Sequence, residues 1–184
     1  ATAAVITQIP ASVMDAGYAT TTAASIASLY LFIAIPGKLV LGHIYDRYGV
    51  KSGILFGNTM FFLSVVCLIF IKHQPFLYLM AILFGFGTCI GTVSAPVITS
   101  GIFGTKHYAE IYGFLSLFPS VGYALGGPLI ASAYDLTGSY NIAWIIVAAL
   151  SIVMTAFLLY SYRVSRVCIK EQEKTADKAK NTMK

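Results

Sequence analysis

Residues 21–51, TTAASIASLYLFIAIPGKLVLGHIYDRYGVK, decide the fold of this chain. The first part, 21–41, holds one charged residue, Lys38, near its end. It is long enough to cross the hydrocarbon core of a bilayer, which takes about 20 predominantly apolar residues. The last ten residues carry Asp46, Arg47 and Lys51. An apolar run that ends in a short charged segment predicts a membrane helix followed by a turn at the membrane surface.

The charge content of the whole chain agrees with a membrane protein. A soluble domain is about 25% charged, whereas 10% of these 184 residues are charged. Ten of the 19 charged residues fall in 163–184, so nine remain for the first 162 residues. Nine charges cannot cover the surface of a water-soluble fold of this size. The composition therefore excludes a soluble enzyme, a disulfide-stapled secreted domain and an ordinary nucleic-acid binder, and it predicts an integral membrane protein.

Five apolar runs are long enough to span a bilayer: 21–41, 53–71, 75–100, 111–133 and 142–162. Residues 1–10 are also apolar but half as long, and we interpret them as the outer end of a helix whose beginning is missing. Lipid admits only helices and closed barrels, and these runs lack the alternation of barrel strands. The sequence therefore predicts an all-α membrane protein, with a six-helix half-domain over 1–162 and a basic cytoplasmic tail over 163–184.

The basic residues are distributed unequally between the two sides of the predicted bundle. One side collects 11 of the 12: Lys38, Arg47, Lys51, Lys106 and the seven of the tail. The other side holds Lys72 alone, beside Asp15, His73 and Asp135. Because cytoplasmic loops carry the excess of Lys and Arg, we expect a multi-pass protein of the plasma membrane with its C-terminus in the cytoplasm. Its first partner is the lipid bilayer, whose anionic headgroups attract such a tail.

Glycines recur at four-residue spacing, which lets neighbouring membrane helices approach closely. The pairs are Gly53 with Gly57, Gly87 with Gly91, and Gly122 with Gly126. They predict close helix packing, and they would also permit the helices to rock or gate around a central site.

The loop GHIYDRYGVK, residues 42–51, contains the most informative spacing. Gly42 would let one helix end press against its neighbour, and Gly49 would permit a backbone turn with positive φ. Asp46 can face the N-terminal dipole of the next helix while it pairs with a base. Arg47 and Lys51 would hold the loop at the cytoplasmic surface.

This loop resembles the cytoplasmic signature of the major facilitator superfamily, Gly-x-x-x-Asp-Arg-x-Gly followed by two basic residues, with Val50 at the first basic position. In that superfamily the motif joins the second and third helices of a six-helix half, and a weaker copy joins the eighth and ninth. The eroded basic pair, the start without Met and the charged tail favour the second copy. The resemblance implies the C-terminal half of a twelve-helix transporter with its first helix truncated, and the N-terminal six-helix half as its partner.

A second resemblance concerns YAEIYG at 108–113, GGPL at 126–129 and YDLTGSY at 134–140. These segments look like the eleventh-helix region of monocarboxylate-type and oxalate/formate-type porters. Oxalate-type members carry a basic residue within the eighth and eleventh helices. The counterpart of the eleventh helix, 111–133, has no charge here, and Lys38 in the eighth lies near its cytoplasmic end. These differences argue against a dicarboxylate substrate.

Polar residues at mid-membrane are the candidates for solute binding, because such groups are costly there unless they serve packing or a cavity. Serine and threonine hydroxyls have a simpler explanation, since they can bond carbonyls of their own helix. The candidates are Gln8, Ser28, Tyr30, Asn58, Thr88, Thr92, Ser116 and Tyr123, with Ser25 and Ser94 in a wider set.

The sequence therefore predicts a secondary active transporter that moves a small organic solute, such as a monocarboxylate, by alternating access. A transporter-like membrane sensor or assembly subunit without net transport is the alternative, and six further helices upstream would favour the transporter. Acids, histidines and metal ligands are not clustered, and no phosphate-binding loop occurs. We therefore expect no enzyme, no metal and no cofactor.

Overall fold

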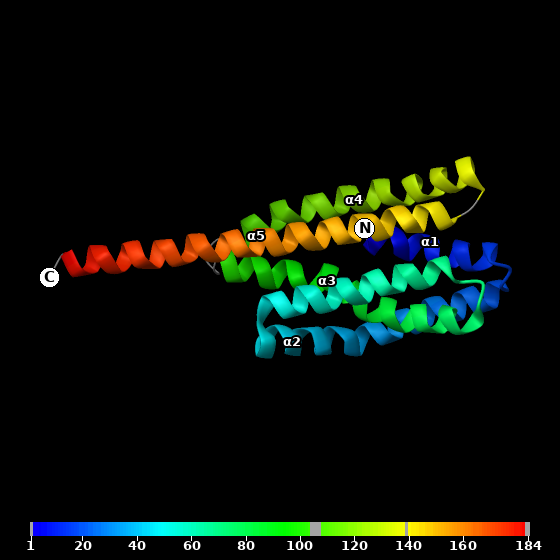
Figure 1. Ribbon diagram of the computed structural model, residues 1–184, viewed down its shortest axis with the longest axis horizontal. Coiled ribbons are helices and arrows are strands. Elements are labelled where there is room, and N and C mark those ends of the chain that lie inside the picture. Colours follow the sequence, from blue (N-terminus) through cyan, green and yellow to red (C-terminus); the bar gives the residue numbers. More distant parts are fainter. Residues whose placement is uncertain (1, 104–107, 139, 183–184) are drawn as a thin grey trace.

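The secondary structure consists of helices joined by short turns (Figure 1). A computed structural model describes residues 2–103, 108–138 and 140–182. Within these ranges there is no strand, which confirms the all-α prediction. The helices are α1 (Thr2–Asp15), α2 (Thr20–Ile69), α3 (Gln74–Phe103), α4 (Tyr108–Thr137) and α5 (Tyr140–Thr182).

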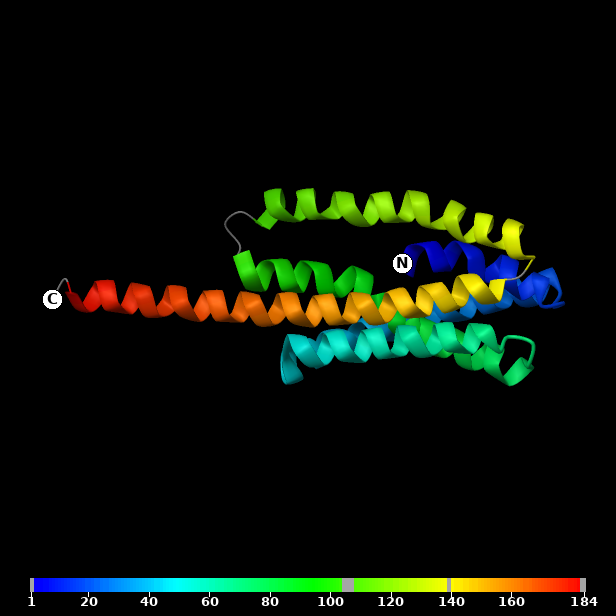
Figure 2. The same ribbon diagram turned by 45° about the horizontal axis from the view of Figure 1, so that its top comes forward.

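α2 consists of two helices that run antiparallel to each other. Gly49 interrupts it with non-helical angles, φ 81° and ψ 170°. At this point the chain reverses, so the second half runs back alongside the first (Figure 2). The positive φ predicted at Gly49 is confirmed. With the two halves of α2 counted separately, the described part of the chain holds six helices.

Several helices extend beyond the apolar runs that predict them. α1 continues past Pro10 to Asp15, so the predicted end at residue 10 is wrong. Pro10 removes one backbone donor, but the remaining turn is still helical and Val13 is fully buried. α5 continues to Thr182, so residues 163–182 of the predicted tail are helical (Figure 1). The apolar composition marks the part of a helix that lipid can surround, and it does not mark the helix ends.

In the ranges that the structure describes, four helices are long and apolar enough to cross a membrane: α2, 74–97 of α3, α4, and 140–161 of α5. The 50 residues of α2 would be about 75 Å long if straight, roughly two and a half times the thickness of a bilayer core. The reversal at Gly49 divides this length into two shorter helices.

The turns separate into two groups at opposite ends of the bundle (Figure 1). The turn at Gly49, the end of α3, the start of α4 and the C-terminal end of α5 lie at one end. The connections from α1 to α2, from α2 to α3 and from α4 to α5 lie at the other. This arrangement places Arg47 and Lys51 at the same end as the C-terminal part of α5, and Asp15, Lys72 and Asp135 at the opposite end.

α3 lies against both halves of α2 at backbone distance. A Cβ added at Gly85 would lie 2.9 Å from the carbonyl oxygen of Tyr30 in the first half of α2. A Cβ added at Gly87 would lie 2.7 Å from the backbone of Phe61 in the second half. These glycines let the helices approach closely enough for dispersion contacts along their length.

The glycine pairs predicted to mediate packing behave differently from one another. Gly53, Gly57 and Gly87 are buried and closely contacted. Gly91 and Gly122, by contrast, have no atom within 4 Å of an added Cβ, so the prediction of tight contact is wrong at these two positions. Spacing alone cannot tell which face of a helix meets a neighbour.

The main hydrophobic core includes residues from all five helices, but α4 contributes little to it. Trp144 of α5 is 1% exposed and packs in the same cluster as Phe61 and Phe84. Ile130 is the buried residue that α4 supplies. Most of the remaining α4 side chains are exposed, including Phe118 and Tyr123. α4 therefore has a long apolar face that nothing in the described chain covers.

Candidate functional site

The segment 42–51 forms the end of the α2 hairpin and displays its charges outward. Asp46, Arg47 and Lys51 are all exposed. The Arg47 guanidinium carbon lies 5.9 Å from the ring centroid of its neighbour Tyr48. The expected pairing of Asp46 with a base is absent among the described residues. These three charges are therefore available to groups outside the described chain.

Gly42 does not press against a neighbouring helix. No atom lies within 4 Å of a Cβ added at this position, so that expectation is wrong for this chain. The close contact occurs instead at Gly53, where an added Cβ would overlap the ring of Tyr45. In this hairpin the second helix, and not the first, supplies the small residue at the contact.

Sequence reasoning did not identify Tyr45 as part of this site. Tyr45 is 6% exposed, and its hydroxyl shares a hydrogen bond with the hydroxyl of Ser94 on α3. Ser94 is 5% exposed. One feature of the sequence could have indicated Tyr45. It is an aromatic residue eight positions before Gly53, and a helical hairpin can bring two such positions together.

Apart from Ser94, the serine and threonine hydroxyls among the predicted solute-binding residues bond to their own helices. Each donates to a backbone carbonyl three or four residues earlier, which is the simpler role that the sequence allowed. The bonds are Ser28 to Ala24 (3.0 Å), Thr88 to Gly85 (3.0 Å), Thr92 to Cys89 (3.2 Å), Ser116 to Gly113 (2.7 Å) and Ser25 to Thr21 (2.9 Å).

The larger candidates occupy different environments. Tyr30 is 3% exposed and packs edge-on against Phe84, with 5.2 Å between ring centroids. Asn58 is 3% exposed, and its Nδ2 has no hydrogen-bond partner among the described residues. Gln8 donates from Nε2 to the carbonyl oxygen of Gly127, 3.4 Å away. The structure therefore does not bring the predicted candidates together into one cluster.

α1 is joined to α4 by two polar contacts. The Gln8 contact with Gly127 lies near the middle of α1, and a second contact lies at the C-terminal ends of the two helices. There the Tyr134 hydroxyl donates to Asp15 Oδ1 at 2.6 Å. Tyr134 also stacks on Tyr140 of α5, with ring centroids 4.4 Å apart. α1 and α4 thus form a linked pair beside the tighter unit of α2 and α3.

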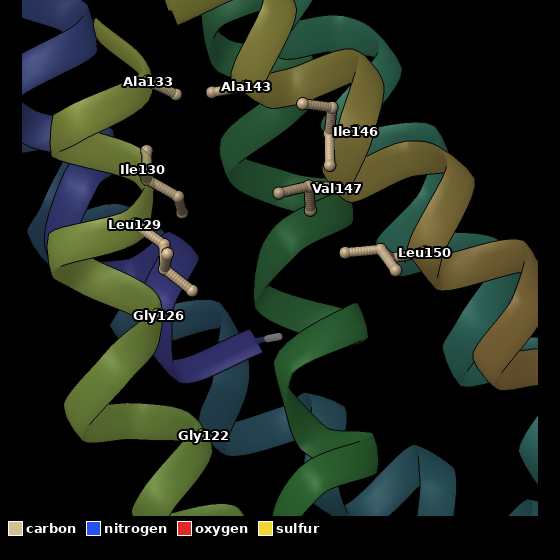
Figure 3. A pocket seen from close by; sticks show the side chains of 9 residues that line it. All are labelled: Gly122, Gly126, Leu129, Ile130, Ala133, Ala143, Ile146, Val147 and Leu150. Carbon is tan, nitrogen blue, oxygen red and sulfur yellow. The ribbon is translucent and has the colours of Figure 1, made fainter. Parts of the chain in front are cut away.

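A pocket of about 410 Å³ lies between α4 and α5 (Figure 3). Figure 3 shows the side chains of the two helices facing each other across it. None of the predicted solute-binding residues lines it, and all its lining residues are apolar. A charged group buried there would lack partners, which is costly. The lining residues are Gly122, Gly126, Leu129, Ile130, Ala133, Ala143, Ile146, Val147 and Leu150.

Comparisons with known proteins identify relatives for this architecture. Mouse monocarboxylate transporter 14 is 28% identical over 136 residues, which cover 73% of this chain and 26% of that protein. Human monocarboxylate transporter 12 is 27% identical over 166 residues, or 88% of this chain and 31% of that protein. Monocarboxylate transporter 9 of Pongo abelii is 32% identical over 110 residues, or 59% of this chain and 21% of that protein. This chain thus spans less than a third of the length of these relatives.

No solved structure matches the chain. The model of the Major Facilitator Superfamily, in contrast, matches residues 1–184. This match agrees with the apolar helices, the reversal at Gly49 and the exposed Asp46 and Arg47. The observations identify a multi-pass integral membrane protein of a transporter family. The chain belongs to the major facilitator superfamily.

Proposed function

We propose that this chain is the C-terminal half of a secondary active transporter that moves a small organic solute by alternating access. The observation that carries the proposal is the hairpin turn at Gly49, which displays Asp46, Arg47 and Lys51 between two membrane-spanning helices of a superfamily member. The names of the relatives make a monocarboxylate the first solute class to test. The cytoplasmic C-terminus and the plasma membrane remain part of this proposal.

The exposed turn would act as a latch for one of the two access states. A change between inward-open and outward-open states requires groups that interact differently in each. Asp46 and Arg47 have no ion-pair partner among the described residues, so a second half can offer them partners in one state and withdraw them in the other.

The uncovered face of α4 would line the solute cavity together with the second half. Tyr123 is 54% exposed and Ser116 is exposed on this helix, while Gln8 contacts it from α1. No Asp, Glu, Lys or Arg lies in 111–133. A carboxylate solute would therefore be neutralised by a base on the second half, and the present half would supply hydrogen bonds and shape.

The full-length protein, reconstituted into liposomes, should accumulate a labelled monocarboxylate when an ion gradient is imposed. The proposed secondary active transport draws its energy from this gradient, so accumulation should stop when the gradient is dissipated. The measurement is uptake of labelled lactate or pyruvate, with protein-free liposomes as the control. Saturable solute binding without any accumulation would favour the sensor or assembly subunit and would contradict the transporter.

Asp46→Asn should reduce the initial uptake rate at least tenfold, because the variant removes the charge that the latch needs and leaves the size of the side chain unchanged. Asp135→Asn is the matched control, since Asp135 is also exposed but lies at the opposite end of the bundle. The test compares initial rates at equal amounts of folded protein. If both variants transport at the wild-type rate, the turn is not a latch.

A further inference from the structure

We propose that Tyr45 is the positioning residue that holds the charged turn against α3. This proposal rests on the proposed function, because it explains how the turn that carries Asp46 and Arg47 keeps its place. Tyr45 directly precedes these two exposed residues. It is the buried polar side chain closest to them in the sequence.

A single side chain contacts three segments of the bundle. Tyr45 belongs to the first half of α2, and its ring fills the space beside Gly53 in the second half. Its hydroxyl is hydrogen-bonded to Ser94 of α3. Leu41 and Cys89, both 0% exposed, complete the apolar cluster around the ring. The turn is thereby fixed to both helices of its own hairpin and to the neighbouring helix α3.

The buried hydrogen bond makes this attachment specific. When one hydroxyl of a buried hydrogen bond is removed, the other stays buried without a hydrogen-bond partner, and this costs free energy. Both residues are more than nine-tenths buried, with Tyr45 6% and Ser94 5% exposed. A sliding movement of α3 against the α2 hairpin has to break this bond. The bond therefore couples the position of α3 to the position of the charged turn.

Gly53 explains why the ring can occupy this place. Any side chain at position 53 would begin inside the volume of the Tyr45 ring. The first Gly of the signature, Gly42, has open space around it. In this chain the turn thus depends on Gly53, because the missing side chain there leaves room for the ring of Tyr45.

The test is limited trypsin digestion of the full-length protein in phosphatidylcholine nanodiscs. Lys51 is the reporter for the charged turn, and Lys72, in the turn at the opposite end, is the reporter for general loosening. Cleavage of a folded protein follows the population of locally open states. Tyr45→Phe should raise the rate of cleavage after Lys51 about fivefold, the factor that corresponds to one net hydrogen bond. Cleavage after Lys72 should not change.

Ser94→Ala should have a similar effect, and Tyr45→Phe combined with Ser94→Ala should cleave no faster than the more sensitive single variant. Tyr48→Phe is the matched control, because Tyr48 is 64% exposed in the same turn. An unchanged rate after Lys51 in Tyr45→Phe, an equal rise after Lys72, or multiplicative effects in the double variant would each overturn the proposal. Cleavage is measured independently of uptake. If Asp46→Asn leaves uptake unchanged, the latch is rejected, and the cleavage rates still decide whether Tyr45 and Ser94 form an anchor that holds the turn against α3.

Discussion

Gly49→Ala should lower the free energy of unfolding by about 2 kcal/mol, because the backbone at this position is in a region essentially restricted to glycine. The angles are φ 81° and ψ 170°. No atom lies within 4 Å of an added Cβ, so the loss comes from backbone strain and not from crowding. The measurement is the temperature at which the buried thiols of Cys67 and Cys89 become reactive in detergent.

Gly42→Ala is the control for this prediction. Gly42 belongs to the same signature, has helical geometry and also has open space around it. Alanine at such a helical position is favourable by up to about 1 kcal/mol relative to glycine. We expect Gly42→Ala to keep or raise the temperature of thiol exposure. An equal fall in this temperature for both variants would show that the positive φ at Gly49 is not the reason why glycine is needed there.

The turn at Gly49 illustrates what the sequence could predict. Three features indicate a turn here: the limited length of a bilayer crossing, the charges between two apolar runs, and a glycine in the charged segment. Each of them depends only on residues close together in the sequence. Local features of this kind can be recognised without knowing the neighbours. The same reasoning failed at Gly42 and Gly91, because the role of a glycine in packing depends on which helix face meets another helix. Their surroundings come from tertiary structure.

The anchor formed by Tyr45 and Ser94 was beyond sequence reasoning for the same reason. The two residues are 49 positions apart, and nothing in the sequence pairs them. Ser94 entered the wider candidate set only because it is polar at mid-membrane. The hydroxyls of Ser28 and Thr88 were recognised on the same basis, yet they bond to their own helices. A polar residue in an apolar run indicates that a partner is needed, but it does not identify the partner.

Asn58 shows how far the described residues satisfy their own polar groups. Its side chain is 3% exposed, and Nδ2 has no partner. An unpaired buried amide costs free energy in lipid or in a packed interior. The sequence predicts that Asn58 binds the solute, and the described residues give its Nδ2 no hydrogen bond that would provide another explanation for a buried amide. Solute binding by Asn58 therefore stays a prediction.

Gly87→Ala should destabilise the protein by about 3 kcal/mol, the upper part of the range for overpacked interiors. An added Cβ would lie 2.7 Å from both Cα and N of Phe61. These are backbone atoms, so no side-chain rotation can relieve the overlap and the two helices have to separate. Separation would also disrupt the contact between Phe61 and Phe84, whose ring centroids are 6.1 Å apart. The same thiol-exposure assay measures the effect.

Gly91→Ala tests whether this loss arises from helix contact or from the loss of glycine itself. Gly91 lies one turn further along α3, and an added Cβ there meets no atom within 4 Å. If close approach to α2 is the cause, alanine at 91 should be neutral or stabilising while alanine at 87 is damaging. If both variants lose stability equally, the helices need glycine for flexibility, and the packing explanation is wrong. The four-residue spacing treats the two positions as equivalent, whereas the structure predicts opposite outcomes because only Gly87 faces Phe61.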